Sequence, residues 1–368
     1  MAKTYRVGII GCTGRGNYGH GLDEAWKEIP QADIVGVADE NAEGRAAAVK
    51  RTGAKAAYAD YRELLDKEKP QIVSVCQRWI DRHHEMIMAC VERGIHVYAE
   101  KPFCRTLQEA DEIIRLSEMT HAKVALAHQT RYCPIIPVVQ RMIADGQLGT
   151  LLEIRARGKE DARGGGEDLW VLGSHLMNMM QVFAGDPQSC FATVTQKGQP
   201  ITKSDVIQGN EGLGPLAGDA IDAQYQFPKG VTGYFSSHRG QEGKPSRFGI
   251  QIFGSKGIVE YLMGFVPDVY FLADPAWSPG RTQAKWQKVS SAGVGQPEPI
   301  QARGTSVGNV VALQDLLAAI EQNREPLCGA LAGRTTIEMI LGVFESQRLG
   351  KPVALPLENR RQHPLTLL

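Results

Sequence analysis

Short apolar runs alternate with longer amphipathic stretches over the first 127 residues of the chain. The runs have the length of buried strands, whereas the longer stretches have the length and composition of helices. We expect strands at residues 6–10, 33–39, 72–76, 95–99 and 123–127, and helices at residues 42–52, 61–67, 82–93 and 106–119. Strands that alternate with helices at this spacing predict an α/β fold with a doubly wound parallel sheet.

The remaining residues change to a strand-rich pattern. Apolar and polar positions alternate as in strands with one solvated face, and short turns join several of these strands. We expect strands at residues 151–157, 189–195, 220–227, 231–238, 248–253 and 258–262, helices at residues 138–145, 169–183, 308–322 and 333–347, and loops at residues 198–218 and 274–306. The pattern predicts an α+β domain with a large, mostly antiparallel open sheet.

We therefore divide the chain into a first domain at residues 1–127 and a second at residues 128–368. We expect that the C-terminal segment of the second domain can pack back on the first domain. The length of 368 residues agrees with two domains. Within the first domain, Thr106 and Glu109 have the spacing of a capping box, and Gly94 is expected to end the preceding helix.

Composition excludes several classes of partner. The 41 Lys and Arg residues balance the 41 Asp and Glu residues, so nothing points to nucleic acid. We find no signal-peptide core and no segment able to span a membrane. The seven cysteines form no CxxC pair, so we expect free, mostly buried thiols in a cytoplasmic protein. No spacing suggests a metal site, and there is no GxSxG nucleophile motif.

A glycine-rich turn, Gly11-Cys12-Thr13-Gly14-Arg15-Gly16, follows the first strand. Glycines at such a turn let backbone N–H groups approach a pyrophosphate at a helix N-terminus. Asp39 lies 23 residues after Gly16, close to the spacing of the acidic residue that binds the ribose hydroxyls. A carboxylate there favours NAD over NADP. The alternatives are an ordinary strand-to-helix turn and an Asp39 that only caps the next helix.

The tripeptide Glu100-Lys101-Pro102 ends another buried strand. The carboxyl ends of strands form the ligand edge of such sheets, where a partly desolvated amine can act as a base. A Lys in an exposed turn is the alternative. Together with the glycine turn and Asp39, this tripeptide resembles the glucose–fructose oxidoreductase / inositol dehydrogenase / MocA (Gfo/Idh/MocA) family. Further motifs extend the resemblance over essentially the whole chain: His128 to Tyr132, Gly254 to Gly257 and Gly350 to Val353.

The resemblance implies an N-terminal Rossmann domain that binds NAD and a C-terminal domain for substrate binding and for assembly into a homodimer or homotetramer. It also implies that Lys101 contacts the nicotinamide ribose and the substrate hydroxyl. Candidate cofactor-binding residues are Gly11, Thr13, Gly14, Arg15, Gly16, Asp39, Gln77, Arg78, Trp79, His84, Glu100, Lys101 and Gln129. Polar residues after strand ends are candidates for substrate binding or exposed surface residues: Arg131, Tyr132, Arg157 and Lys159, joined by His175.

A second group of candidate residues follows Gly164-Gly165-Gly166. Asp168 is expected to cap the helix at residues 169–183, and Asp168, Val171, His175 and Asn178 then share one helix face. The resembled family has the pattern GGGxLxDxGxHxxD here, which places an Asp and the His near the substrate. This chain has Val171 and Asn178 where the family has Asp. Asp168 is therefore either a catalytic partner of His175 or a pure helix cap.

The leading hypothesis is an NAD-dependent oxidoreductase that acts on a secondary hydroxyl of a sugar, cyclitol or related polyol. Lys101 would accept or donate the proton, assisted by His175, with Asp168 as a third catalytic candidate. A second hypothesis is an enzyme that oxidises a glycoside transiently, eliminates the aglycone and restores NAD. A third is a non-catalytic, NAD-binding regulatory protein.

Overall fold

A computed structural model describes residues 3–302 and 304–368, and the chain divides into two compact units. The first unit contains Met1–Gln129, Asn210–Gly214 and Thr305–Ile337, and the second contains Thr130–Gly209, Pro215–Gly304 and Glu338–Leu368. All seven cysteines are buried and none forms a disulfide, which confirms the expected state of the thiols. Within the residues described, no helix combines the length and apolar character needed to cross a bilayer.

A six-stranded, fully parallel sheet forms the centre of the first unit, in the order β3-β2-β1-β4-β5-β6. The strands are β1 (Tyr5–Ile10), β2 (Ala32–Ala38), β3 (Ala56–Tyr58), β4 (Ile72–Val75), β5 (His96–Ala99) and β6 (Val124–Leu126). Both faces of the sheet are covered, which explains why β4 is buried at every residue. The predicted doubly wound parallel sheet is confirmed, and its strand order reverses between β1 and β4, where such sheets bind ligands.

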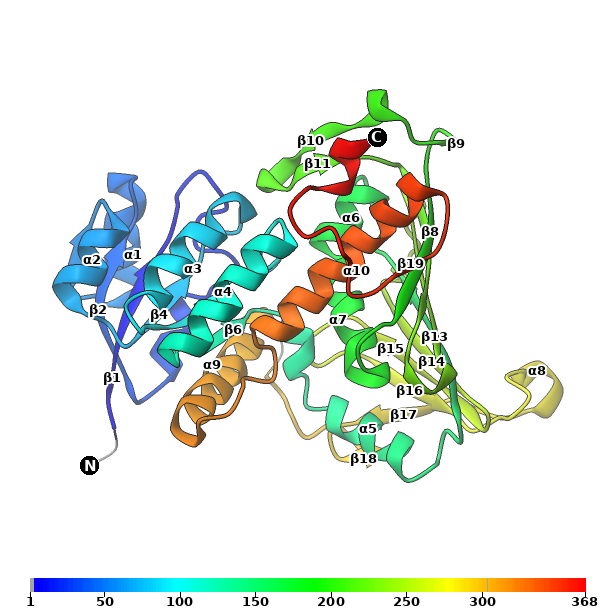
Figure 1. Cartoon of the computed structure of the whole chain (residues 1–368). Helices are drawn as coiled ribbons and strands as arrows, with labels where there is room; N and C mark the ends of the chain where they lie inside the picture. The colour runs from blue at the N-terminus through cyan, green and yellow to red at the C-terminus, as the bar shows by residue number, and fades with distance from the viewer. Residues whose placement is uncertain (1–2, 303) are drawn as a thin grey trace. The chain divides into compact units, whose positions relative to one another are not determined.

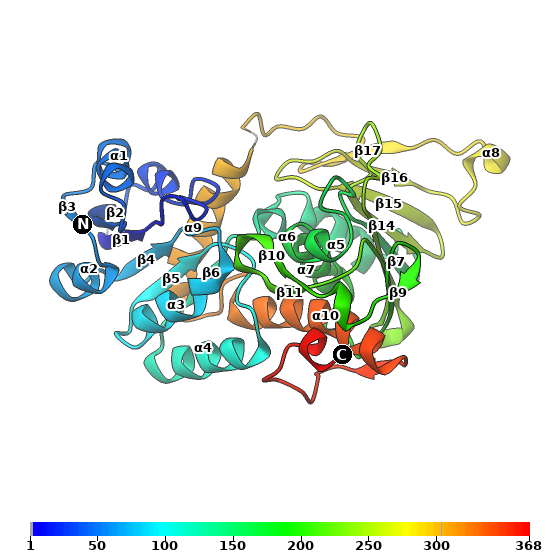
Figure 2. The same ribbon diagram turned by 90° about the horizontal axis from the view of Figure 1, so that it is seen from above.

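Helices cover both faces of this sheet. Figure 2 shows α2, α3 and α4 on one face and α1 and α9 on the other. Their bounds are α1 (Ala42–Thr52), α2 (Tyr61–Glu68), α3 (His83–Val91), α4 (Leu107–Thr120) and α9 (Thr305–Gln322). The hydroxyl of Thr106 accepts the Glu109 N–H at 3.1 Å, as predicted for an N-cap. The Glu109 carboxylate accepts the N–H of Arg105 instead of that of Thr106, so the capping box is half formed.

The glycine-rich turn does not lead into a helix, so the predicted helix N-terminus at this position is wrong. Between residues 14 and 21 the backbone is left-handed at Gly14 (φ 89°), Gly16 (φ 85°), Asn17 (φ 54°), Gly19 (φ 63°) and Gly21 (φ 81°). A right-handed helix cannot pass through so many left-handed residues. Only a short 3₁₀ helix, η1 (Glu24–Glu28), precedes β2.

The second unit is built on a large mixed sheet in the order β18-β17-β16-β15-β14-β7-β13-β12-β8-β19, with β9 paired to β8. Only β7 and β13 pair in parallel, which confirms the predicted, mostly antiparallel sheet. The main strands are β7 (Leu151–Arg157), β8 (Ser189–Gln196), β12 (Ala220–Gln226), β13 (Thr232–His238), β14 (Gly249–Gly254), β15 (Gly257–Leu262) and β16 (Val269–Leu272).

The two segments expected to be loops contain short strands. These are β9 (Gln199–Pro200), β10 (Ile207–Gly209), β11 (Gly214–Leu216), β17 (Gln287–Ser290) and β18 (Gly293–Val294), and a further strand near the C-terminus is β19 (Val353–Ala354). Each is four residues or fewer, too short for a visible alternation of apolar and polar positions. A one-turn helix, α8 (Pro279–Thr282), precedes β17.

One face of this sheet carries helices and the other is open (Figure 1). The helices are α5 (Ile136–Ala144), α6 (Gly166–Val171), α7 (Gly173–Ala184) and the second half of α10 (Ala330–Leu349). The strand register places one row of side chains across eight strands of the open face: Phe191, Gln224, Tyr234, Arg155, Gln251, Glu260, Tyr270 and Lys288. Aromatic, amide and charged groups therefore alternate along this row.

The single helix predicted at residues 169–183 is two helices. Leu172 (φ −114°, ψ −39°) separates α6 from α7. The N-cap position of α6 is Gly165, and Asp168 lies inside the helix, so its predicted capping role is wrong. A Cβ atom on Gly165 would lie 2.4 Å from the Gly218 carbonyl oxygen, so this close packing requires glycine.

Candidate functional site

Glu100, directly after β5, is a fully buried carboxylate. It binds His20, in the segment that follows the glycine-rich turn. Its Oε1 accepts the N–H of His20 at 2.9 Å and lies 2.6 Å from His20 Nδ1, and its Oε2 accepts the Lys101 N–H at 2.9 Å. Burial alone would raise the pKa of Glu100, but the hydrogen bonds from His20 and the charge of Lys101 outweigh it and lower the pKa. Glu100 is therefore an anion that fixes the backbone on either side of it.

Asn309 on α9 extends this network. Its side-chain NH₂ donates to the His20 carbonyl oxygen at 2.9 Å, and its Oδ1 accepts from Gln129 at 3.0 Å and from the Tyr98 hydroxyl at 2.8 Å. Sequence reasoning singled out Gln129 and missed Asn309. The one indication in the sequence was a polar residue within an otherwise apolar stretch of α9. The structure shows that this residue is fully buried.

Lys101 occupies the position predicted for it, at the carboxyl end of β5. The residue is only 3% exposed, so the alternative of a Lys in an exposed turn is excluded. The ligand edge of the parallel sheet therefore carries a buried, amine-bearing side chain beside the anionic Glu100.

Asp39 follows β2 and binds the glycine-rich turn. Its Oδ2 accepts the Thr13 hydroxyl at 2.7 Å and the Thr13 N–H at 3.1 Å, and its Oδ1 accepts the Asn41 N–H at 2.9 Å. Thr13 stands at the middle position of the GxGxxG fingerprint, where glycine is usual. Its hydroxyl donates to Asp39, a hydrogen bond that glycine could not make. Asn41, not Asp39, caps α1 through its side chain, so the alternative of Asp39 as the cap is wrong.

The segment after β4 brings further predicted cofactor residues to the same edge. The Arg15 guanidinium stacks 4.7 Å from the Trp79 ring and pairs with Asp81, and Arg78 pairs with Glu211 at 2.9 Å. Gln77 is fully buried, and its Oε1 has no hydrogen-bond partner among the residues described. A buried acceptor in this state suits a ribose hydroxyl, so the Gln77 oxygen and the Asp39 carboxylate fit a dinucleotide.

His83, at the start of α3, is a residue that sequence reasoning passed over in favour of His84. It is fully buried, with Nδ1 2.8 Å from the Pro102 carbonyl oxygen and Nε2 2.7 Å from that of Gln77. Each ring nitrogen of His83 therefore faces a backbone carbonyl oxygen. His84 is partly exposed and lies 2.9 Å from the Glu112 carboxylate. Helical spacing was the missed signal, because His83 shares its face with the buried Ile87.

In the second unit, His175 lies in the first turn of α7. It is 9% exposed, and its Nδ1 lies 3.4 Å from the Thr130 hydroxyl. Arg131 donates to the Asn178 side-chain oxygen at 3.2 Å and to Gln181 at 2.9 Å. Asn178, which replaces an Asp of the family pattern, therefore accepts a hydrogen bond from a predicted substrate residue.

Asp168 and His175 lie on different helices, so they do not share a helix face as predicted. The Asp168 Oδ2 accepts the Ser237 hydroxyl at 2.5 Å and the Glu160 N–H at 3.1 Å. Burial raises the pKa of Asp168, and the Ser237 bond opposes part of this rise. Through these contacts, Asp168 links α6 to β13 and to the segment after β7.

The predicted substrate residues are not all brought together. Arg157 ends β7 on the open face of the sheet and pairs with Glu160 at 2.9 Å, whereas the buried positions of β7 and β13 face the helices. Lys159 pairs with Asp161 at 3.4 Å in the following segment. Tyr132 is buried beside Arg131 in the chain. Arg131 is therefore the predicted substrate residue that the structure links to α7, the helix of His175.

Metal ligation has no geometric support in the residues described, since no group of three His, Cys, Asp or Glu side chains converges there. The first unit instead offers a glycine-rich turn, the buried carboxylate of Asp39 and a buried Lys at one sheet edge. This arrangement suits binding of a dinucleotide and proton transfer to or from a bound hydroxyl.

Comparisons with known proteins agree with this arrangement. Residues 5–128 match the family model described as "Oxidoreductase family, NAD-binding Rossmann fold", and residues 137–260 match the "GFO/IDH/MocA C-terminal domain". A solved levoglucosan dehydrogenase, in complex with NADH and levoglucosan, has a TM-score of 0.78 over 96% of this chain and 100% of that chain, at 19% identity. That likeness shows a common fold.

Curated relatives align with this chain only in part. D-apiose dehydrogenase of Paraburkholderia graminis is 25% identical over 214 residues, which cover 55% of this chain and 56% of that protein. A glycosyl hydrolase family 109 protein of Streptomyces niveus is 31% identical over 171 residues, which cover 44% of this chain and 34% of that protein. The aligned regions thus span about half of the first relative and a third of the second.

Replacing Glu100 with Gln should destabilise the first unit at neutral pH by roughly 2 kcal/mol, because the bonds to His20 lose their charge. The pKa of folded Glu100 lies below its ordinary value of 4.5. The contribution of Glu100 to the free energy of unfolding is therefore present above about pH 4.5, and it is lost as the pH falls through the pKa of folded Glu100. Thermal unfolding between pH 3 and 7 should show the two proteins converging in acid; a constant difference would contradict this.

Proposed function

Because the chain belongs to the Gfo/Idh/MocA family of NAD-binding oxidoreductases, we propose that it transfers hydride between NAD and a secondary hydroxyl of a sugar, cyclitol or related polyol. The observation that carries the proposal is Lys101, a buried lysine at the carboxyl end of β5, on the sheet edge that binds the dinucleotide. The names of the similar apiose and levoglucosan dehydrogenases support a carbohydrate substrate.

The first unit supplies the groups that hold NAD. Asp39 would bind the ribose hydroxyls nearest the adenine and repel a 2′-phosphate, and the buried Gln77 oxygen is free to accept from a second hydroxyl. When bound, NAD supplies the acceptor for the hydride that leaves the carbinol carbon. Lys101 accepts the hydroxyl proton through its amine in the oxidation and returns it in the reverse direction.

His175 assists as a second proton-transferring or orienting group. Val171 and Asn178 replace the two carboxylates of the family pattern, and the His175 ring lies near the Thr130 hydroxyl. A histidine without those carboxylates is a weaker base, so the principal role falls to Lys101. Arg131, which contacts α7 through Asn178 and Gln181, would donate hydrogen bonds to substrate hydroxyls.

A second candidate function is glycoside cleavage by transient oxidation, elimination of the aglycone and return of the hydride. The similarity to a glycosyl hydrolase family 109 protein favours it, as does the altered pattern around His175. The two functions differ in their balance of cofactor. A dehydrogenase accumulates NADH, whereas the cleavage reaction regenerates NAD in every turnover.

Lys101→Ala should lower turnover by roughly 10²- to 10⁴-fold, because it removes the proton acceptor, while NAD binding is largely spared. Lys55→Ala, an exposed lysine that pairs with Asp33, is the matched control. We would follow NADH absorbance with NAD and a panel of sugars, cyclitols and glycosides, and identify products by mass spectrometry. Full activity of Lys101→Ala would overturn the assignment.

The product pattern separates the candidate functions. A keto product with NADH indicates the dehydrogenase, and aglycone release without NADH indicates glycoside cleavage. NAD binding without either reaction, across the whole panel, would favour a regulatory protein that no longer catalyses hydride transfer.

We further propose that the chain acts in the cytoplasm as a homodimer or homotetramer assembled through the open face of its large sheet. Phe191 and Tyr234 are exposed there, at 42% and 39%, in the cross-strand row described above. The variant Phe191→Glu/Tyr234→Glu should reduce the mass measured by light scattering to that of a monomer. Met119→Glu, at an exposed apolar residue of α4, is the control. A wild-type mass of about 40.2 kDa would exclude the assembly.

A further inference from the structure

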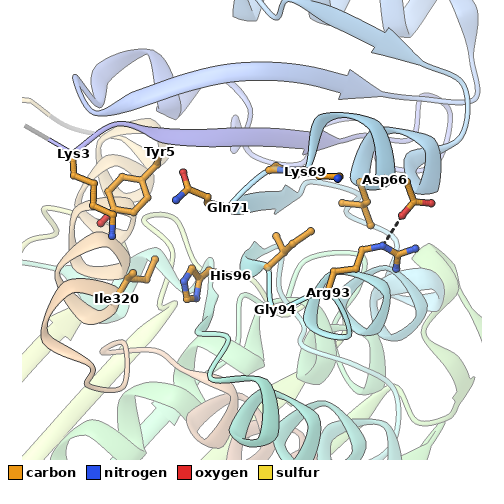
Figure 3. Close-up of a pocket in the computed structure, with 12 residues that line it drawn as sticks. Lys3, Tyr5, Asp66, Lys69, Gln71, Arg93, Gly94, His96 and Ile320 are labelled. Atoms are coloured by element: carbon orange, nitrogen blue, oxygen red, sulfur yellow. Dashed lines mark hydrogen bonds and ion pairs between the residues drawn. The ribbon is translucent and has the colours of Figure 1, made fainter.

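A cavity of about 610 Å³ lies at the amino ends of β1, β4 and β5, within the first unit (Figure 3). All strands of this sheet are parallel, so the cavity lies on the opposite sheet edge from Asp39, Gln77 and Lys101. Its volume is in the range of small-molecule sites. Nothing in the chemistry proposed above uses it.

The walls of this cavity are apolar and preformed. Tyr5, Leu65 and Ile95 line it with buried side chains, and Ile320 of α9 closes one side. The Tyr5 hydroxyl donates to Glu321 at 3.1 Å, which fixes the ring as a wall of the cavity. A ligand body can therefore pack here without a large rearrangement.

The neutral polar groups in the lining are hydrogen-bond donors. His96 Nδ1 accepts the Lys123 N–H at 2.9 Å, so the ring hydrogen is on Nε2. Burial, with the charges of Lys123 and Lys3, lowers the pKa of His96 to about 4 and keeps the ring neutral. The Gln71 side-chain oxygen accepts the Arg6 N–H at 3.1 Å, which leaves its NH₂ group to donate. Such a lining suits a ligand rich in acceptor oxygens.

Charge at the cavity is positive. Lys3, Lys69 and Arg93 line it against a single carboxylate, Asp66. Arg93 is engaged by Asp66 at 2.8 Å and by the Ala89 carbonyl oxygen at 2.8 Å. The amines of Lys3 and Lys69 have no carboxylate partner among the residues described, and the Lys3 amine lies 4.9 Å from the centroid of the Tyr5 ring. The C-terminal ends of α2 and α3 contribute only about half a negative charge each, less than the charge of these two amines.

Figure 3 shows the amines of Lys3 and Lys69 at different ends of the cavity. Lys3 lies with Tyr5 and Ile320 at one end, Lys69 lies toward Asp66 and Arg93 at the other, and Gln71 and His96 stand between them. A compact monovalent anion could engage only one amine at a time. An elongated molecule with an anionic group at each end would engage both.

We propose that this cavity binds a small, elongated metabolite with two or more oxyanion groups, as phosphate esters or carboxylates. One anionic group pairs with Lys3 and another with Lys69, and the central donors of Gln71 and His96 bind oxygens of the ligand body. The site is independent of hydride transfer, and its test does not read enzymatic activity.

Isothermal titration calorimetry of the full chain, saturated with NAD to occupy the cofactor edge, would test the site with fructose 1,6-bisphosphate and with citrate. We expect saturable one-to-one binding of at least one probe, and tighter binding than that of inorganic phosphate. Lys3→Gln and Lys69→Gln should each weaken binding at least about fivefold, and Lys69→Arg should retain it. Lys67→Gln is the matched control, because Lys67 is exposed on α2 and pairs with Glu63 at 2.9 Å outside the cavity.

The two probes also distinguish phosphate esters from carboxylates as the ligand class. A shift of the His96 ring resonances on titration would place the ligand in the cavity. The proposal is overturned if neither probe binds the NAD-saturated chain up to roughly 20 mM, or if Lys67→Gln weakens binding as much as Lys69→Gln. Unchanged thermal unfolding of the variants would show that they fold normally.

Discussion

The bond between the buried Glu100 carboxylate and His20 is the constraint on which the cofactor edge depends. An ion buried without partners would cost several kcal/mol, so Glu100 must keep its donors from His20 and from the Lys101 backbone. The chain can reach Glu100 only by a close approach at Gly19, where a Cβ atom would lie 2.5 Å from Oε1. Gly19 belongs to the run of left-handed residues that stands where a helix was expected, and the same carboxylate fixes the backbone of Lys101.

Most of the fold follows from the sequence pattern because its causes are local or regular. Parallel strands buried on both faces are continuous apolar runs, and strands with one solvated face alternate, so both sheets were predictable. The strands β17 and β18 were not, because their pairing partners lie elsewhere in the chain and each segment is too short to show a period. The break at Leu172 was hidden for a different reason, since its neighbours on both sides suit a continuous helix.

The candidate site was predictable where a residue type and its strand position coincide, as at Lys101 and Asp39. It was not predictable where tertiary contacts decide. His83 and His84 are adjacent in the sequence, yet the His83 ring lies between two carbonyl oxygens while His84 contacts the Glu112 carboxylate. Asn309 lies some two hundred residues from the tyrosine it contacts, and no local pattern can indicate that distance. Asp168 lies at a plausible cap position in the sequence. In the structure it instead links α6 to β13 by accepting the Ser237 hydroxyl.

The seven enclosed thiols give the protein a built-in reporter of its own opening motions. Cys12, Cys76, Cys90, Cys104 and Cys328 lie in the first unit, and Cys133 and Cys190 lie in the second. Burial raises the pKa of thiols such as Cys76 and Cys190, so an alkylating reagent meets little thiolate until the surrounding structure opens. The alkylation rate at each cysteine therefore follows the local opening equilibrium of the unit that contains it. The opening of the two units can be measured separately in one chain without mutation.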